Sequence, residues 1–331
     1  MTHRRNRLSI EQYVQGVLQQ DRVILSRAIT LVESSHPADQ VLADAVLHQI
    51  LPHAGRSLRI GITGVPGVGK STFIEAFGQH VLQQGHRLAV LTVDPSSQAS
   101  KGSILGDKTR MSALASDKRA FIRPSPSGNS LGGVAAKTRE AMLLCEAAGF
   151  DVIFVETVGV GQSETVVKGM VDFFLLLMLA GAGDELQGIK KGIIETADAL
   201  VITKADGDNV TPAKKAKKEY QNALHLFPAH ESGWRPLVKI CSALEAIGLE
   251  EVWHMIGDYV QTVQANGYFN HNRAQQRLSW MHEHIKWTLE TRFYNDPAVR
   301  ERMKALAPMV EKGEVPALAT ARQLVQDFLG T

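Results

Sequence analysis

The stretch that decides the fold is Gly64-Val65-Pro66-Gly67-Val68-Gly69-Lys70-Ser71, which matches the pattern G-x-x-x-x-G-K-[ST] at every fixed position. It follows an apolar run, Leu58 to Thr63, and leads through Thr72 into a helical pattern. The glycines let the backbone curl so that successive N–H groups point at an anion, while Lys70 reaches the outer phosphates and the Ser71 hydroxyl ligates Mg²⁺. The stretch therefore predicts a phosphate-binding loop for a nucleoside triphosphate, with residues 64–72 as its contacts.

Five further apolar runs follow along the chain, separated by helical patterns. Near-continuous apolar strands of this kind are typical of a mostly parallel sheet that helices cover on both faces. We therefore predict an α/β fold of the P-loop nucleoside-triphosphatase type, in a domain that spans residues 56–266. The predicted strands after the first are Leu88 to Val93, Val152 to Glu156, Phe173 to Ala180, Ala199 to Thr203 and Leu237 to Cys241.

Helical patterns flank this predicted domain on both sides. An N-terminal helical extension covers residues 1–55, and Ser9 and Gln12 within it have the spacing of a capping box. The C-terminal region, residues 267–331, shows no convincing strand pattern. Its predicted helices are Gln275 to Tyr294, Pro297 to Val310 and Pro316 to Leu329.

The first of these C-terminal helices is unusually rich in apolar residues. It has more apolar positions than a helix buried on one side needs, among them Leu278, Met281, Ile285 and Leu289. We therefore expect the C-terminal region to be a dimerisation arm and the protein to be a homodimer, because symmetric pairing is the commonest closed arrangement. The alternative is that the arm packs back on its own sheet.

Composition narrows the possible partners. The 331 residues carry a formal net charge of +2, which is too small to argue for nucleic acid or an anionic membrane as a partner. The two cysteines, Cys145 and Cys241, each lie in an apolar stretch and are expected to be buried thiols of a reduced compartment. The longest apolar run, Phe173 to Ala180, is too short to span a membrane. We expect a cytoplasmic protein.

The loop after the run Ala199 to Thr203 predicts which base is bound. It reads Thr203-Lys204-Ala205-Asp206 and is similar to the N-K-x-D loop of guanine-reading P-loop proteins, with threonine in place of asparagine. In that loop the carboxylate accepts from the guanine N1–H and exocyclic amine, and the lysine stem lies over the base. Adenine offers no such pair of donors, so Asp206 favours GTP and GDP, with Lys204 as a second base contact.

A later strand end supports the same base. The segment Cys241-Ser242-Ala243-Leu244 matches the loop that caps the guanine O6 from the backbone, and it lies at the expected place after Asp206. Alone it is a weak signal. Ser242, Ala243 and Leu244 therefore join the predicted nucleotide-binding residues.

Acidic residues at predicted strand ends are candidates for the metal shell. The run Glu156-Thr157-Val158-Gly159 is an E-x-x-G version of the usual D-x-x-G, in which the carboxylate anchors Mg²⁺ through water. Asp94, directly after the run Leu88 to Val93, is a second candidate. Asp107 is a third, although a turn or capping role explains a single aspartate in a glycine-flanked loop equally well. The predicted metal shell is Ser71, Asp94, Asp107 and Glu156.

Two features predict slow hydrolysis that a partner accelerates. In small signalling GTPases a glutamine directly after the D-x-x-G glycine orients the attacking water, but here Val160 occupies that place and Gln162 is displaced. The charged, glycine-rich segment Gly181 to Lys191 has the composition of a mobile loop, with an ordinary solvated connection as the alternative. Its lysine pair could be pushed toward the phosphates by a partner. The predicted catalytic residues are Lys70, Asp94, Glu156, Lys190 and Lys191.

Five longer motifs carry a resemblance to a known family. They read G-V-P-G-V-G-K-S-T, V-D-P-S-S, G-S-I-L-G-D-K-T-R-M, E-T-V-G-V-G-Q-S-E and G-A-G-D-E-L-Q-G-I-K-K-G. With these motifs the chain resembles, over nearly its whole length, the MeaB family of GTPases. These are the bacterial relatives of human methylmalonic aciduria type A protein, earlier described as ArgK or LAO/AO transport kinases.

The resemblance implies a GTPase chaperone of adenosylcobalamin-dependent acyl-CoA mutases, usually methylmalonyl-CoA mutase. Such a protein is a homodimer that gates cobalamin delivery by the adenosyltransferase and protects or reactivates the mutase using GTP. By the same resemblance, Asp94, Asp107 and Glu156 belong to the metal shell and the switches. The segment Gly183 to Lys191 resembles the family's third switch, which couples the nucleotide to the mutase.

Three other functions stay open. A kinase of the older description would need a pocket and a base for an acceptor group, and no residue pattern identifies one. A metallochaperone GTPase would need a Cys/His cluster of ligand spacing, and the histidines, such as His48, His53 and His80, are scattered. A nucleotide-dependent assembly scaffold with negligible turnover is compatible with the displaced glutamine. It differs from the favoured function only in whether partner binding raises the rate.

Overall fold

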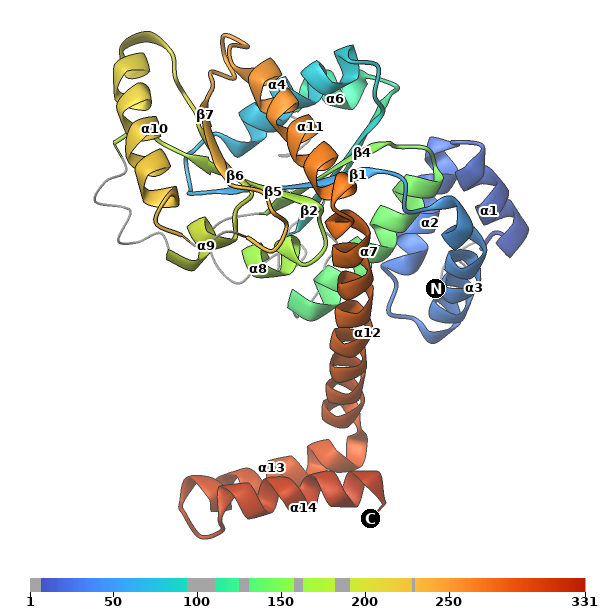
Figure 1. Ribbon diagram of the computed structural model, residues 1–331. Coiled ribbons are helices and arrows are strands. Elements are labelled where there is room, and N and C mark those ends of the chain that lie inside the picture. Colours follow the sequence, from blue (N-terminus) through green and yellow to red (C-terminus); the bar gives the residue numbers. More distant parts are fainter. Residues whose placement is uncertain are drawn as a thin grey trace. The chain divides into compact units, whose positions relative to one another are not determined.

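Seven parallel strands form the central sheet, in the order β3-β2-β4-β1-β5-β6-β7 (Figure 1). The structure is a computed structural model that describes residues 7–93, 111–124, 131–157, 163–181, 191–227 and 230–330. Five of the strands are buried along almost their whole length, which explains their continuous apolar sequences. The strands are β1 Leu58–Gly64, β2 Leu88–Val93, β3 Ala120–Arg123, β4 Val152–Thr157, β5 Phe173–Met178, β6 Ala199–Ile202 and β7 Leu237–Ile240.

Helices cover both faces of this sheet, as predicted. On one face lies α4, whose Phe77 ring stacks on Phe154 of β4 with the centroids 5.5 Å apart. On the other face lies α8, because a Cβ at Gly61 of β1 would come within 3.0 Å of Val167. Figure 1 shows α4, α6 and α11 on the first face and α7 and α8 on the second. Their bounds are α4 Lys70–Gln83, α6 Ser112–Ser116, α7 Leu131–Ala147, α8 Ser163–Lys168 and α11 Leu249–Ala265.

All six predicted strands are confirmed, with small shifts at their ends. The structure extends β1 to Gly64 and β4 to Thr157, and it ends β5 at Met178, before the predicted Ala180. The remaining strand, β3, was not predicted from sequence. It has four residues and pairs with β2 alone at the edge of the sheet, so its sequence is too short to show a period.

The predicted N-terminal helical extension is a bundle of α1 Ile10–Leu18, α2 Arg22–Val32 and α3 Pro37–Ile50, followed by the 3₁₀ turn Leu51–His53. Ser9 caps α1 as its spacing predicts: the Gln12 N–H donates to the Ser9 hydroxyl at 3.2 Å, and the Ser9 N–H donates to the Gln12 side chain at 2.9 Å. The helices bury Leu25, Ile29 and Val46 against one another and against α7.

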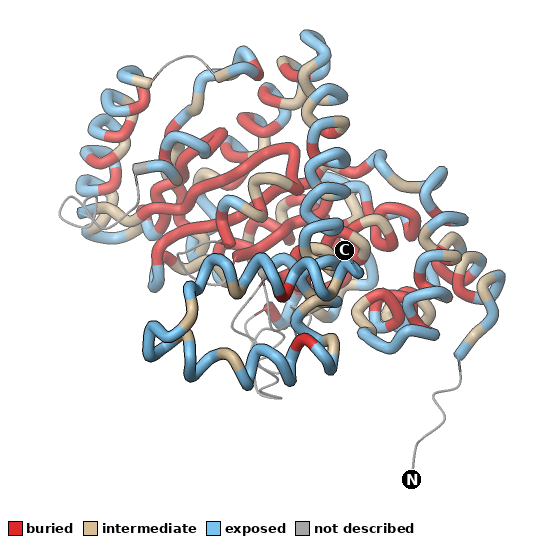
Figure 2. The backbone as a smooth tube through the Cα atoms, turned by 90° about the horizontal axis from the view of Figure 1, so that it is seen from below, coloured by how far each residue is buried: buried red, intermediate tan, exposed pale blue. Residues whose placement is uncertain are grey.

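By its contacts the chain divides into two compact units, residues 1–276 and 277–331. In the second unit α13 Pro297–Glu311 packs on α14 Ala317–Leu329, and Phe293 meets Phe328 edge to face with the centroids 5.3 Å apart. The division falls inside α12, Tyr268–Asn295, so the domain border predicted at residue 267 stays a prediction. Figure 2 shows that burial is concentrated in the strands, whereas α13 and α14 are largely exposed.

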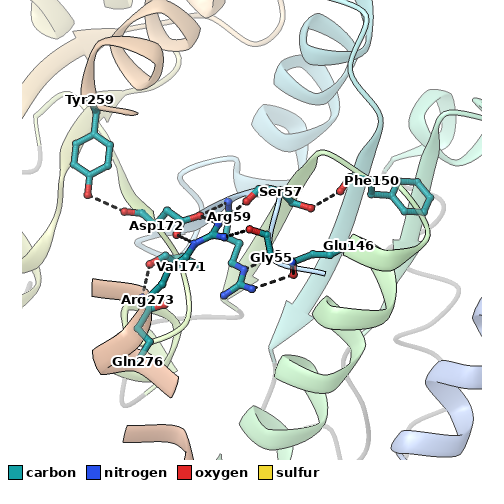
Figure 3. A network of polar contacts seen from close by, with 10 residues as sticks. All are labelled: Gly55, Ser57, Arg59, Glu146, Phe150, Val171, Asp172, Tyr259, Arg273 and Gln276. Carbon is teal, nitrogen blue, oxygen red and sulfur yellow. Dashed lines mark hydrogen bonds and ion pairs between the residues drawn. The ribbon is translucent and has the colours of Figure 1, made fainter. Parts of the chain in front are cut away.

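The first turns of α12 are fixed to the sheet of the first unit by a buried polar network (Figure 3). Arg273 donates to both carboxylate oxygens of Asp172, at 2.7 and 2.6 Å, and to the carbonyls of Gly55 and Ser57, each at 2.5 Å. Asp172 also accepts from the backbone N–H of Arg59 at 2.8 Å. Because Asp172 and Ser57 directly precede β5 and β1, this network lies at the amino ends of the strands.

In the described part of the chain the remaining elements are α9 Lys191–Thr196, the 3₁₀ turn Gly207–Asn209 and α10 Val210–Leu224, of which α10 packs against β6 and β7. Both cysteines are free and buried. Burial raises the pKa of the Cys241 thiol to about 12, so this thiol is neutral at physiological pH.

Candidate nucleotide-binding site

The predicted phosphate-binding loop connects β1 to α4. Gly64 is the last residue of β1, and a Cβ there would lie 2.6 Å from the Leu177 carbonyl oxygen of β5, so no side chain fits. Gly69 precedes the helix with φ of 89°, a backbone conformation that favours glycine. Lys70, Ser71 and Thr72 form the first turn of α4. The loop thus directs the helix N-terminus, with its positive dipole end, toward the carboxyl ends of the strands.

The Lys70 side chain folds back onto the start of the phosphate-binding loop. Its Nζ donates to the Gly64 carbonyl oxygen at 2.8 Å. Burial lowers the pKa of the Lys70 ammonium, while the carboxylates of Glu156 and Glu164 oppose that shift. The charges of these two carboxylates therefore favour the protonated form of the lysine that is predicted to contact the outer phosphates.

Glu156 lies on the face of the sheet that α4 covers. It is two residues after Phe154, whose ring stacks on α4, and side chains two apart in a strand share a face. Its register neighbours are Ile62 on β1 and Thr92 on β2. Glu156 is buried, and among the described residues the buried Thr92 hydroxyl beside it has no hydrogen-bond partner.

The predicted metal residues that the structure describes have the chemistry of ligands for a hard divalent cation. The Ser71 hydroxyl and the Glu156 carboxylate are oxygen donors, which Mg²⁺ prefers, and the unpartnered Thr92 hydroxyl offers a further oxygen where an ordered water could bond. Asp94 and Asp107, the other two predicted metal residues, lie outside the described residues. Of the predicted metal shell, the structure describes only Ser71, in the first turn of α4, and Glu156, on β4, and their role as metal residues stays a prediction.

The predicted base-reading loop follows β6 and lies against the phosphate loop. Lys204 has φ of 56°, and its Cε lies 3.8 Å from the position that a Cβ on Gly69 would take. The lysine stem thus lies close to the loop that is predicted to hold the phosphates. The Asn209 side-chain amide donates to the Lys204 carbonyl at 2.6 Å and closes the turn.

Asp206 and Ser242, which were predicted to contact the base separately, are hydrogen-bonded to each other in the structure. The Ser242 hydroxyl donates to Asp206 Oδ2 at 2.5 Å, and the Ala205 N–H donates to the Cys241 carbonyl at 3.0 Å. The loops after β6 and β7 therefore form one surface. Ala243 is partly buried there, whereas the side chain of Leu244 is 79% exposed.

The predicted switch residues are mostly outside the described part of the chain. Gly159, Val160, Gln162 and Lys190 are not described, and of Lys191 only the backbone is, as the first residue of α9. Their predicted roles stay predictions.

Two residues near the site were not assigned a role from sequence. The hydroxyl of Thr203, at the position where the related loop has asparagine, donates to the Val68 carbonyl of the phosphate loop at 2.8 Å. Glu164, buried on α8, is one of the two carboxylates that oppose the lowering of the Lys70 pKa. Glu164 ends the quoted motif E-T-V-G-V-G-Q-S-E, so its position in that motif was the available signal.

The parallel sheet, the glycine loop at the end of β1 and the helix that starts at Lys70 define a P-loop nucleotide-binding protein. Comparison with known proteins identifies the class more closely. The family model described as methylmalonyl Co-A mutase-associated GTPase MeaB matches residues 25–298. The chain belongs to this MeaB family and is a GTPase.

Individual relatives agree with this assignment. GTPase ArgK of Escherichia coli is 51% identical over 276 residues, covering 83% of each chain. The mitochondrial methylmalonic aciduria type A homolog of Mus musculus is 44% identical over 96% of this chain and 79% of its own length. A crystal structure titled LAO/AO transport system kinase matches with a TM-score of 0.76 and 40% identity, and the match covers 98% of both chains.

Within the described ranges, no helix combines the length and the apolar character that crossing a bilayer requires.

Proposed function

We propose that this GTPase is a chaperone of an adenosylcobalamin-dependent acyl-CoA mutase, with methylmalonyl-CoA mutase as the expected client. On this proposal it gates cofactor delivery, together with a cobalamin adenosyltransferase, and protects or reactivates the mutase. The family description supports the client, since it names association with methylmalonyl-CoA mutase. The observation that supports the nucleotide part is the joined pair of loops, in which the Ser242 hydroxyl donates to Asp206 and the Lys204 stem lies near Gly69 of the phosphate loop.

Guanine recognition follows from the chemistry of Asp206. A carboxylate accepts from the N1–H and the exocyclic amine of guanine, whereas adenine would leave the charge unpaired. The hydrogen bond from Ser242 to Oδ2 restricts rotation of the carboxylate, and both of its oxygens keep acceptor capacity for the two guanine donors. Asp206→Asn should weaken GTP binding by about 2–4 kcal/mol and improve binding of xanthosine triphosphate, whose exchanged donor suits the amide.

The hydrolytic step needs positioning and charge stabilisation more than covalent chemistry. Water forms a bond to the γ-phosphorus and the bridging bond to the β-phosphate breaks, giving GDP and phosphate. Lys70, in the first turn of α4, would contact the outer phosphate oxygens. Ser71 and Glu156 would hold Mg²⁺, which neutralises the charge of the phosphates when bound.

A partner is proposed to complete the catalytic site. No glutamine follows the glycine of E-T-V-G directly, because Val160 takes that place, so we expect slow intrinsic turnover. Lys190 and Lys191 lie in the segment that resembles the third switch. On this proposal the bound mutase brings one of these cations to the phosphates and raises the rate.

The homodimer is proposed from an exposed apolar stripe on α12. Leu278, Met281, Ile285 and Leu289 follow helical spacing along one side, and each is 48–55% exposed. A stripe of this kind is typical of a helix that pairs with another chain, because an exposed apolar face gains free energy when it is covered. A second copy of this chain is the proposed cover.

A GTPase assay with and without purified methylmalonyl-CoA mutase tests the chaperone proposal. Turnover that rises at least tenfold on addition of the mutase, with the two proteins co-eluting in gel filtration, supports it. Binding without acceleration supports the scaffold alternative. Transfer of the γ-phosphate to a small-molecule acceptor, followed with labelled GTP, would support the kinase alternative instead.

A further inference from the structure

The hydroxyl of Thr92 is a buried polar group without a hydrogen bond. Thr92 lies on β2 and is 3% exposed, and its Oγ1 has no hydrogen-bond partner among the described residues. Every other residue of β2 is apolar, so valine, which has nearly the same shape, would suit this position in the fold better. A buried hydroxyl that bonds to nothing destabilises a protein by about 1–3 kcal/mol. In a native protein such a group needs an explanation, for example an ordered water or ion that the chain binds.

The strand register places this hydroxyl beside Glu156. Thr92 on β2 is the register partner of Glu156 on β4, and Glu156 is the register partner of Ile62 on β1. Register partners on adjacent strands lie about 5 Å apart and direct their side chains to the same face of the sheet. Glu156 is on the face that α4 covers, and α4 begins at Lys70 of the phosphate loop. Thr92 therefore shares a buried face with the carboxylate that is proposed to hold Mg²⁺ through water.

The chemistry of a hydrated Mg²⁺ ion suits a hydroxyl at this place. A water on the ion binds it through oxygen, so both hydrogens of that water need acceptors. The Glu156 carboxylate is proposed to accept one of them, and the Thr92 oxygen is an available acceptor for the second. The Thr92 hydroxyl keeps its own hydrogen to donate, because a hydroxyl both donates and accepts. Mg²⁺ retains several waters in proteins, so contacts to those waters contribute to how tightly the ion is held.

We infer that Thr92 is a positioning residue for the metal, which holds a water of the Mg²⁺ hydration shell through its hydroxyl, together with Glu156. The inference rests on the proposed magnesium site of Ser71 and Glu156 and adds a residue to it. It also gives the unpartnered hydroxyl a function, because a group that destabilises the free chain gains its partner when nucleotide and metal bind. A hydroxyl that served the fold alone would do the opposite and stabilise the chain without a ligand.

Thr92→Val separates these two roles, because valine keeps the shape and removes the hydroxyl. The first readout is the dissociation constant of Mg²⁺ from the protein's complex with fluorescent N-methylanthraniloyl-GDP, which is measured by titration and needs no turnover. We expect Thr92→Val to weaken Mg²⁺ binding about tenfold and to leave the affinity for this nucleotide in EDTA unchanged. Thr92→Ser keeps the hydroxyl and should bind Mg²⁺ as tightly as the wild type.

The second readout is the melting temperature of the nucleotide-free protein in EDTA. Thr92→Val should not lower it, because the hydroxyl that it removes has no partner among the described residues. Thr138 on α7 is the matched control, since it is 2% exposed and its hydroxyl donates to the Val134 carbonyl at 2.9 Å. Thr138→Val should lower the melting temperature and leave Mg²⁺ binding unchanged.

The outcomes separate the inference from the site it rests on. Wild-type Mg²⁺ affinity in Thr92→Val overturns the inference, even where Glu156→Ala weakens Mg²⁺ binding and so supports the site itself. A fall in melting temperature as large as that of Thr138→Val also overturns it, because the Thr92 hydroxyl would then have a partner within the chain. So does a loss of Mg²⁺ affinity that Thr92→Ser shares. If the wild-type complex binds no Mg²⁺, the proposed magnesium site fails first and the inference fails with it.

Discussion

Replacing Arg273 with methionine should unfold the first unit at markedly lower temperature. The guanidinium carries bonds to both oxygens of Asp172 and to the carbonyls of Gly55 and Ser57 (Figure 3). The side chains of Arg273 and Asp172 are 6% and 1% exposed, so solvent does not replace the lost partner. The variant leaves a buried carboxylate with the Arg59 N–H as its remaining described donor.

The size of the effect follows from these contacts. Removing one partner of a buried, hydrogen-bonded ion pair costs about 3–5 kcal/mol, because the other charge stays in the interior unpaired. Methionine keeps most of the apolar contact, so the cost comes mainly from the polar groups. For a unit of this size, 1 kcal/mol corresponds to about 2–4 °C, and the melting temperature should fall by about 10 °C.

The assay is thermal and urea unfolding of the full chain followed by circular dichroism. Arg277→Met, an exposed arginine on the same helix, is the matched control and should change stability by less than about 0.5 kcal/mol. The double variant Asp172→Asn with Arg273→Met should be more stable than Arg273→Met alone, because it removes the stranded charge. The reasoning is refuted if Arg273→Met stays within 1 kcal/mol of the wild type, or if the two changes are simply additive.

Three further predictions concern pH, the metal and the dimer. Burial raises the pKa of the Glu140 carboxyl from 4.5 to about 7; the negative charge of Asp44 adds to this shift and Lys137 opposes it. Between pH 4.5 and 7 the folded protein therefore holds a proton that the unfolded chain releases, and the free energy of unfolding falls by about 3 kcal/mol as the pH rises through this range. Glu140→Gln should therefore raise the melting temperature relative to the wild type at pH 8 but not at pH 4.5, and equal shifts at both would contradict the assignment. Glu156→Ala should keep nucleotide affinity in EDTA but lose Mg²⁺-dependent turnover at least tenfold, and an unchanged rate removes this residue from the site. Truncation after Gln276 keeps Arg273 and Gln276, which fix α12 to the first unit, and should give a monomer in light scattering that still binds GTP. If the truncated protein is still a dimer, the C-terminal region is not the dimerisation arm.

The position of that truncation shows where sequence and structure differ. From sequence, the C-terminal helical region begins at residue 267, and a cut before Asn272 would look harmless to the first unit. The structure shows that Arg273 and Gln276 belong to the first unit, since Gln276 donates to the Val171 carbonyl at 2.7 Å and Arg273 binds Asp172. A cut before Asn272 would remove both.

The local features of the chain were predictable from sequence alone. The glycine pattern of residues 64–71 specified a strand, a loop and a helix, because each position there has a steric or charge requirement that few residue types meet. Continuous apolar runs specified six of the seven strands, and five of these are buried on both faces, which requires apolar residues at successive positions.

The tertiary structure alone decided which distant residues meet. Asp172 and Arg273 are 101 positions apart, and Thr203 is 135 positions from Val68. The pattern around each residue reports only whether its own surroundings are apolar or polar. Which polar groups share one buried place depends on the strand order and on the path of every connection between them, so the pairings arise only when the sheet has closed around them.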